Sequence, residues 1–290
     1  MIQARLFEQA SKEGYWIRVV ATALESAQTC MAPYGSRFSR HDFTQRQHLV
    51  ILVLKTLQKT TYRGICDFLH ASSDVRDAMG LKKVPHYTTI QKFADRAEIM
   101  PVIDAMLADL TRRMSKETPD MAIDSTGIES TCASRYYVSK RSPRESRYIK
   151  VSVAVLCGLC VPCAVVVDWG PGSDITQAPE LIDKAMAVLT PRHVYMDKGY
   201  DCEGLHEQLR DRYGVESVIP PVGRGPNNVV KTKYRSLMRK GLPGRYGLRW
   251  HSETVMSSLK RMTGPSTSSR GTHRPLIEAA LKVLAYTVHR

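Results

Sequence analysis

The spacing of apolar residues changes near residue 120, and this change constrains the fold more than any other feature of the 290-residue chain. Before it, apolar residues recur at helical spacing in segments such as HDFTQRQHLVILVLKTLQ. After it, short strand-like segments alternate with helix-like ones. Helices followed by such an alternation predict an all-α region and then a mixed α/β sheet with helices on its faces.

The first region, residues 1–115, is predicted to be helical. TTYRGICDFLHAS, SDVRDAMGL, a turn at KKVP and the polar-faced HYTTIQKFADR follow one another. Helices separated by a short turn, the last with a polar face, are typical of a helix-turn-helix DNA reader. Thr89 and Lys92 on that polar face are the expected DNA contacts. An ordinary all-α bundle shows the same pattern and stays open as an alternative.

The second region, residues 116–290, contains five strand-like segments, which are MAIDSTGIES, RYIKVSVAVLCG, CAVVVDWG, HVYMDKGY and VESVIPPV. Helices are predicted in SDITQAPELIDKAMAVL and CEGLHEQLRDRYG, and YGLRWHSETVMSSLKRMTG is predicted to be a single helix. A last helix, in HRPLIEAALKVLAYTVHR, is expected to pack on the core. Residues 223–245 show no clear pattern of secondary structure.

The charge balance indicates a polyanionic partner. The chain has 42 Lys and Arg against 28 Asp and Glu, a net charge of +14, which favours nucleic acid over a membrane surface. Residues 217–252 contain no acid but eight basic residues, and among these Lys231, Lys233 and Arg235 are expected to contact DNA phosphates. A second basic run lies in residues 135–150. A solvated charged face is the alternative for both runs.

The remaining composition favours a soluble, intracellular protein without a membrane span. The N-terminus lacks an apolar signal core, and Gly158 and Pro162 interrupt the longest apolar run. The seven cysteines, an odd number, indicate reduced thiols. The three cysteines of CGLCVPC have metal-like spacing but no fourth ligand nearby, so we expect small buried side chains there instead.

Three acids have positions that suggest a shared site. Asp124 lies in the first predicted strand, Asp197 ends the fourth, and Glu253 lies on a polar helix stripe about 60° wide with Tyr246, Arg249 and Lys260. Asp168 is interpreted as a turn residue, and Asp174 and Asp201 as helix caps.

Converging carboxylates repel one another unless cations lie between them, and hard oxygen ligands suit Mg²⁺. A pair of metal ions can assist displacement at phosphorus. The residues therefore predict two ions, and oxygen ligands do not discriminate Mg²⁺ from Mn²⁺. A solvated stripe carrying an Arg249–Glu253 pair is the alternative.

The motifs AIDSTG and YMDKGYD, with the spacing Tyr246-x2-Arg249-x3-Glu253-x6-Lys260, resemble the DDE transposases of prokaryotic insertion sequences. The subgroup with a Tyr/Arg/Glu/Lys signature is the most similar, and the resemblance covers about residues 118–290. It implies a ribonuclease H-like DDE catalytic domain in residues 116–290, preceded by the helical DNA-binding region of residues 1–115.

The resemblance also implies roles for these residues. Asp124, Asp197 and Glu253 would be catalytic and hold the metal ions, while Tyr246, Arg249 and Lys260 would contact DNA. The enzyme would cleave DNA at the terminal inverted repeats and transfer the strand to target DNA, as a homodimer on DNA in the cytoplasm, at the prokaryotic nucleoid. A catalytically decayed DNA-binding protein and a metal-dependent nuclease of the same fold are the alternatives.

Overall fold

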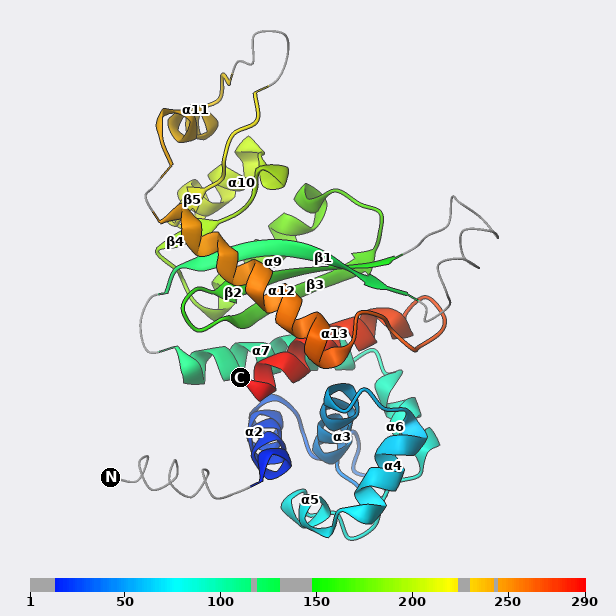
Figure 1. Cartoon of the computed structure of the whole chain (residues 1–290). Helices are drawn as coiled ribbons and strands as arrows, with labels where there is room; N and C mark the ends of the chain where they lie inside the picture. The colour runs from blue at the N-terminus through cyan, green and yellow to red at the C-terminus, as the bar shows by residue number, and fades with distance from the viewer. Residues whose placement is uncertain (1–13, 116–118, 131–147, 224–229, 243–244) are drawn as a thin grey trace, which may run out of the picture.

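A five-stranded sheet covered by helices lies against a bundle formed by the N-terminal helices (Figure 1). The computed structural model describes residues 14–115, 119–130, 148–223, 230–242 and 245–290. The part of the second basic run that covers residues 135–147 therefore lies outside the described residues. Among those that are described, no helix combines the length and the apolarity needed to cross a membrane.

The N-terminal helices follow the predicted pattern. They are α2 (Tyr15–Cys30), α3 (Gln45–Leu57), α4 (Tyr62–Ala71), α5 (Ser73–Ala78), α6 (Tyr87–Ala94) and α7 (Ile99–Met114). A capping box fixes the start of α3, because the Thr44 side chain accepts from the Gln47 amide and the Gln47 side chain accepts from the Thr44 amide. The prediction of helices in this region is confirmed.

The sheet has the strand order β3-β2-β1-β4-β5. Its strands are β1 (Met121–Glu129), β2 (Tyr148–Leu156), β3 (Val161–Trp169), β4 (His193–Tyr195) and β5 (Glu216–Val218). β1, β2 and β3 pair antiparallel, whereas β4 pairs in parallel with β1 and with β5. The predicted mixed sheet with flanking helices is therefore confirmed, and β1 occupies its centre.

Helices cover both faces of the sheet. α9 (Asp174–Val188) and α10 (Glu203–Glu207), which continues as a π-helical turn at Gln208–Arg212, pack on one face. α7, α12 (Trp250–Thr263) and α13 (Arg274–His289) pack on the other. Two parts of the prediction were wrong. Residues 246–264 are not one helix, because Tyr246–Arg249 form a 3₁₀ turn before α12, and residues 233–240 form a helix, α11 (Lys233–Lys240).

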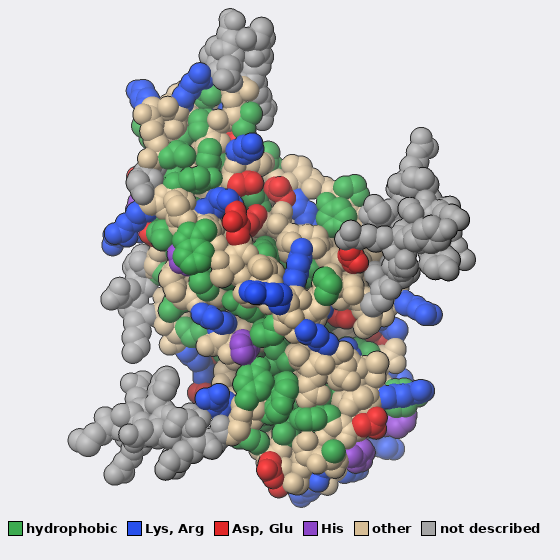
Figure 2. Space-filling view, viewed as in Figure 1, with side chains coloured by type: hydrophobic (Ala, Val, Ile, Leu, Met, Phe, Trp, Pro, Cys, Tyr) green, Lys and Arg blue, Asp and Glu red, His purple; other side chains and the backbone are tan. Residues whose placement is uncertain are grey.

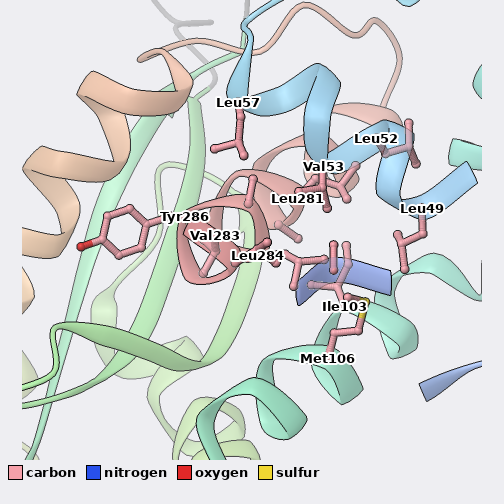
Figure 3. Packing of buried hydrophobic residues seen from close by; sticks show 14 of the residues in the cluster. Leu49, Leu52, Val53, Leu57, Ile103, Met106, Leu281, Val283, Leu284 and Tyr286 are labelled. Atoms are coloured by element: carbon pink, nitrogen blue, oxygen red, sulfur yellow. The ribbon is translucent and has the colours of Figure 1, made fainter. Parts of the chain in front are cut away.

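One hydrophobic core joins the N-terminal helices to the sheet. Figure 3 shows side chains of α3, α7 and α13 packed together, with Leu52, Ile103 and Leu284 among them. The same cluster continues through Val151 and Val153 of β2. The C-terminal helix α13 thus completes a core begun by residues of the first 115, so the proposed boundary at residues 115/116 runs through shared packing.

Candidate active site

Asp124 lies near the middle of β1, on the central strand of the sheet. Its Oδ1 accepts a hydrogen bond of 2.8 Å from the Ser125 amide, and its Oδ2 accepts one of 3.3 Å from the hydroxyl of Ser252 in α12. Burial raises the pKa of the Asp124 carboxyl, and the neighbouring Asp197 raises it further. The Ser125 amide, Arg249 and Ser252 act in the opposite direction without cancelling the increase. An ionised Asp124 therefore needs a cation nearby.

Asp197 follows β4 by two residues, and the parallel register brings it to the side of Asp124. Met121 pairs with Val194 and Ala122 with Tyr195, so continuing this register sets Asp124 beside Asp197. The Asp197 Oδ1 accepts a hydrogen bond of 2.6 Å from the Gly199 amide and so caps the 3₁₀ turn at Lys198–Tyr200. The two candidate aspartates thus lie together although 72 residues separate them in the chain.

Glu253 lies in the first turn of α12, with 56% of its side chain exposed. Its carboxylate forms a close ion pair with Arg249, whose Nη1 lies 4.0 Å from the Asp124 Oδ2. The Arg249 guanidinium therefore bridges the two acids. The described residues contain no group of three His, Cys, Asp or Glu side chains that could hold a metal ion as they stand. The structure brings Asp124 and Asp197 together, and it pairs the Glu253 carboxylate with Arg249.

Tyr246 and Lys260 differ in their surroundings. The Tyr246 hydroxyl donates a hydrogen bond of 3.2 Å to the carbonyl of Met196, the residue before Asp197. Tyr246 therefore ties the 3₁₀ turn to the end of β4. Lys260 is partly exposed in the last turn of α12. Figure 2 shows acidic side chains gathered near the N-terminal end of α12, with Lys and Arg side chains around them.

The basic residues in and just before α11 do not all present their charge to solvent. Lys231 is exposed, and Lys233 is exposed while lying 3.8 Å from Asp211. Arg235 instead forms two hydrogen bonds of 2.7 Å with the buried Asp201 and one of 2.8 Å with the Val222 carbonyl. The guanidinium is committed to this buried pair, which argues against the predicted phosphate contact of Arg235. Asp201 is likewise an ion-pair partner and not a helix cap.

The helix expected to read DNA is α6. Thr89 and Lys92 are both exposed on it, as the polar face predicted. α6 packs against α3 and α4 through Ile90 and Phe93, which are buried. The geometry leaves the polar side of α6 accessible.

Two residues near the aspartates were missed or misinterpreted in the sequence. Ser252 is fully buried and bonds Asp124, and its only signal was its place beside Glu253. Asp174 was interpreted as a cap, but Ser173 holds the N-cap position of α9. The Asp174 carboxylate instead bonds the hydroxyl of Ser125, next to Asp124. Its position at the start of α9, shortly after β3 ends at Trp169, was the signal.

Comparisons with known proteins identify the family of the chain. No curated protein matches the chain. Among solved structures, the chain is similar to the cryo-EM structure of the piggyBac transposase synaptic complex with hairpin DNA, at 11% identity and a TM-score of 0.44, over 96% of this chain and 72% of that one. Residues 115–288 match the family model described as the transposase DDE domain, a match that spans the sheet, all three candidate acids and α12. The chain belongs to the DDE transposase family.

Proposed function

We propose that this protein is a transposase of a prokaryotic insertion sequence, in the subgroup with the Tyr/Arg/Glu/Lys signature. It would cleave DNA at the element ends and transfer the cut strand to target DNA. The observation that carries the proposal is the meeting of Asp124 and Asp197 at neighbouring strands, with Glu253 across from them, within the region of the family match. The strand order is consistent with a ribonuclease H-like catalytic domain in residues 116–290.

The residues present fit divalent metal ions. Asp124 is a desolvated carboxylate beside a second carboxylate, an arrangement that needs positive charge. Arg249 supplies such charge in this structure, and Glu253 could join the two aspartates once its side chain leaves Arg249. Carboxylate oxygens suit one or two Mg²⁺ or Mn²⁺ ions. When bound, these ions would stabilise charge on the phosphate oxygens during displacement at phosphorus.

The other residues would bind and orient DNA. Arg249, released from Glu253, presents a planar guanidinium that suits a phosphate. Tyr246 would hold the 3₁₀ turn against the strand that carries Asp197. Lys260, with the exposed Lys231 and Lys233, would contact the phosphate backbone near the site.

The first 115 residues would recognise the terminal inverted repeats, with Thr89 and Lys92 on the exposed face of α6 in contact with DNA. Two element ends must be brought together for strand transfer, so we propose a homodimer assembled on DNA in the prokaryotic nucleoid. Recognition of the inverted repeats and formation of the homodimer are both binding events, so each can be tested separately from cleavage.

The test is an assay of cleavage and strand joining. The purified full chain would be incubated with labelled element-end DNA and a plasmid target, with Mg²⁺ or with EDTA. The parent, Glu253→Gln and Glu207→Gln would be compared, since Glu207 is an exposed glutamate of α10 and makes the matched control. We expect joined products from the parent and Glu207→Gln only with metal, and none from Glu253→Gln.

Other outcomes favour the alternatives. Cleavage without joined products would favour a metal-dependent nuclease of the same fold. Binding without cleavage by all three proteins would favour a decayed DNA-binding protein. Cleavage by Glu253→Gln at the parent's rate would remove the third acid from the proposed site.

A further inference from the structure

Lys150 is a buried lysine of β2, with only 5% of its side chain exposed. Its ammonium donates a hydrogen bond of 2.7 Å to the Gly172 carbonyl and lies 2.7 Å from the Asp174 Oδ1. A buried ammonium without a partner is strongly disfavoured, so Lys150 requires Asp174. The pair joins the middle strand of the antiparallel part of the sheet to the first residue of α9.

The Asp174 carboxylate lies beside both segments that carry the candidate aspartates. Its Oδ1 accepts from the hydroxyl of Ser125, the residue after Asp124 in β1. Its Oδ2 borders Gly199, where an added Cβ would lie 3.3 Å from the Asp174 Oδ2 and 2.9 Å from the Asp197 Oδ1. One side chain thus bonds the strand of the first aspartate and lies close to the turn that follows the second.

The electrostatics agree with this placement. Burial alone would raise the pKa of the Asp174 carboxyl, but its bonds with Lys150 and Ser125 lower the pKa below the ordinary value. Asp174 is therefore ionised and neutralised by Lys150. The pKa of the nearby Tyr200 phenol is raised by burial and by the charges of Asp174, Asp124 and Asp197.

Stability alone gives little reason for such a pair. Replacing a buried ion pair by apolar side chains of similar volume is often neutral or stabilising. Here the pair links β2 through Asp174 to β1, and Asp174 also lies close to the turn at residues 198–200. A rigid charged link at this place fixes geometry, because each of its hydrogen bonds has a defined direction and length.

We propose that Asp174, held by Lys150, is a positioning residue that sets the spacing of Asp124 and Asp197. The proposal rests on the proposed function, in which those two aspartates hold divalent metal ions. Asp174 is assigned a positioning role because its Oδ1 is held by Lys150 and Ser125, while its Oδ2 faces Gly199. Its effect would be transmitted through the strand that it bonds and the turn that it lies beside.

The test measures metal binding to the full chain without DNA. Free Mn²⁺ would be followed by its electron paramagnetic resonance signal during titration of the parent, Asp174→Asn and Asp168→Asn. Asp168 is an exposed aspartate of β3 whose carboxylate, among the described residues, accepts a hydrogen bond from the adjacent Trp169 amide alone, so the same substitution there is the matched control. Thermal unfolding would be measured on every variant.

We expect Asp174→Asn to weaken Mn²⁺ binding about 10-fold or more, the usual cost of removing a partner that orients metal ligands, and Asp168→Asn to bind like the parent. Ser125→Ala, which removes one link and keeps the Lys150–Asp174 pair, should give a smaller loss. This second variant carries the test if Asp174→Asn does not fold. A merely structural Asp174 would lower Tm and leave the Kd of the folded protein for Mn²⁺ unchanged.

Asp124→Asn separates the inference from the function on which it rests. If the parent binds Mn²⁺, Asp124→Asn does not, and Asp174→Asn and Ser125→Ala bind as the parent does, the positioning role is overturned and the proposed function stands. If the parent binds Mn²⁺ no better than Asp124→Asn, the metal site itself is refuted and the inference falls with it.

Discussion

Arg249 stands between two of the carboxylates that the proposed function assigns to metal ions, and its removal should strengthen metal binding. Its Nη1 lies 4.0 Å from the Asp124 Oδ2, and its Nη2 is paired closely with Glu253. In Arg249→Gln the positive charge is absent and part of the side-chain stem is retained. A divalent ion would then meet two carboxylates without first displacing a guanidinium or lying beside it.

The magnitude follows from the geometry. Two unit charges 4 Å apart interact by about 4 kcal/mol at an effective dielectric constant of 20 and by about 1 kcal/mol in bulk water. The Arg249 side chain is 24% exposed and that of Glu253 more than half exposed, which places the pair near the aqueous limit. Relief of roughly 1–2 kcal/mol corresponds to a Kd for Mn²⁺ lower by about 5- to 30-fold.

The assay is the Mn²⁺ titration of the full chain at pH 8 and low salt. A pH above neutrality is needed because Arg249 lowers the pKa of Asp124, so its loss raises that pKa further and favours protonation at lower pH. Arg261→Gln, at an exposed position of the same helix, is the matched control. Under the proposed function, DNA cleavage by Arg249→Gln should nevertheless fall, because the proposed phosphate contact is lost with the guanidinium.

In Arg249→Gln the affinity for Mn²⁺ must therefore rise while the rate of DNA cleavage falls. If Arg249→Gln binds Mn²⁺ no more tightly than the parent and Arg261→Gln, the ion pair does not compete with metal. The bridging position of Arg249 would then have no bearing on the affinity of the site.

Three further outcomes test other parts of the structure. Arg235→Met should destabilise the protein to urea by about 3 kcal/mol at pH 7, because it leaves Asp201 buried and unpaired. The pKa of Asp201 is lowered in the folded protein, so its ion pair with Arg235 stabilises the fold at pH values above the unfolded pKa of about 3.9. The stability lost in Arg235→Met should therefore shrink as the pH falls below that pKa, and an equal loss at all pH values would contradict this. Burial lowers the pKa of His206 to about 4, so the unfolded chain binds the extra proton between pH 6.5 and 4, and stability should fall by roughly 3 kcal/mol across that window. His206→Asn should flatten that part of the urea-unfolding curve, and an unchanged curve would assign the dependence elsewhere. Lys92→Ala should weaken DNA binding uniformly across sequences and reduce the salt slope by about 1, measured by fluorescence anisotropy, whereas an unchanged slope would remove Lys92 from the interface.

The sheet and the placement of Asp124 and Asp197 at its strands could be predicted because the signals are local. Each aspartate interrupts a strongly apolar segment, and a strand pattern of that kind reports burial directly. The parallel pairing of β1 with β4 then brings the two together. The order of strands along the chain was enough to anticipate a mixed sheet, although not which strands are neighbours.

The helix α11 could not be predicted because its start depends on a distant residue. Among its eight residues only Tyr234 and Met238 are buried, so the apolar pattern is too sparse to indicate a helix. Its first amides are satisfied by Glu203, whose carboxylate accepts from the backbone of Tyr234 and Arg235. A capping group on another element leaves no trace in the local sequence.

The misinterpretation of Asp174 and Asp201 has the same physical origin. An aspartate at the start of a helix is ordinarily a cap, and both residues stand at such places. Their true partners, Lys150 and Arg235, come from other elements, and only the folded chain shows the pairing. The single helix predicted for residues 246–264 was wrong for a local reason, since a 3₁₀ turn and an α-helix differ too little in period to be separated over four residues.

The packing of α13 into the N-terminal bundle has a consequence for synthesis of the chain. The helices of the first 115 residues leave the ribosome long before Leu281 and Leu284 exist, and until then the faces of α3 and α7 that these leucines cover are exposed. A nascent chain therefore cannot complete the helical region before the catalytic sheet has also emerged. Under the proposed function, interrupted translation would therefore produce no folded DNA-binding region that could occupy an element end without cutting it.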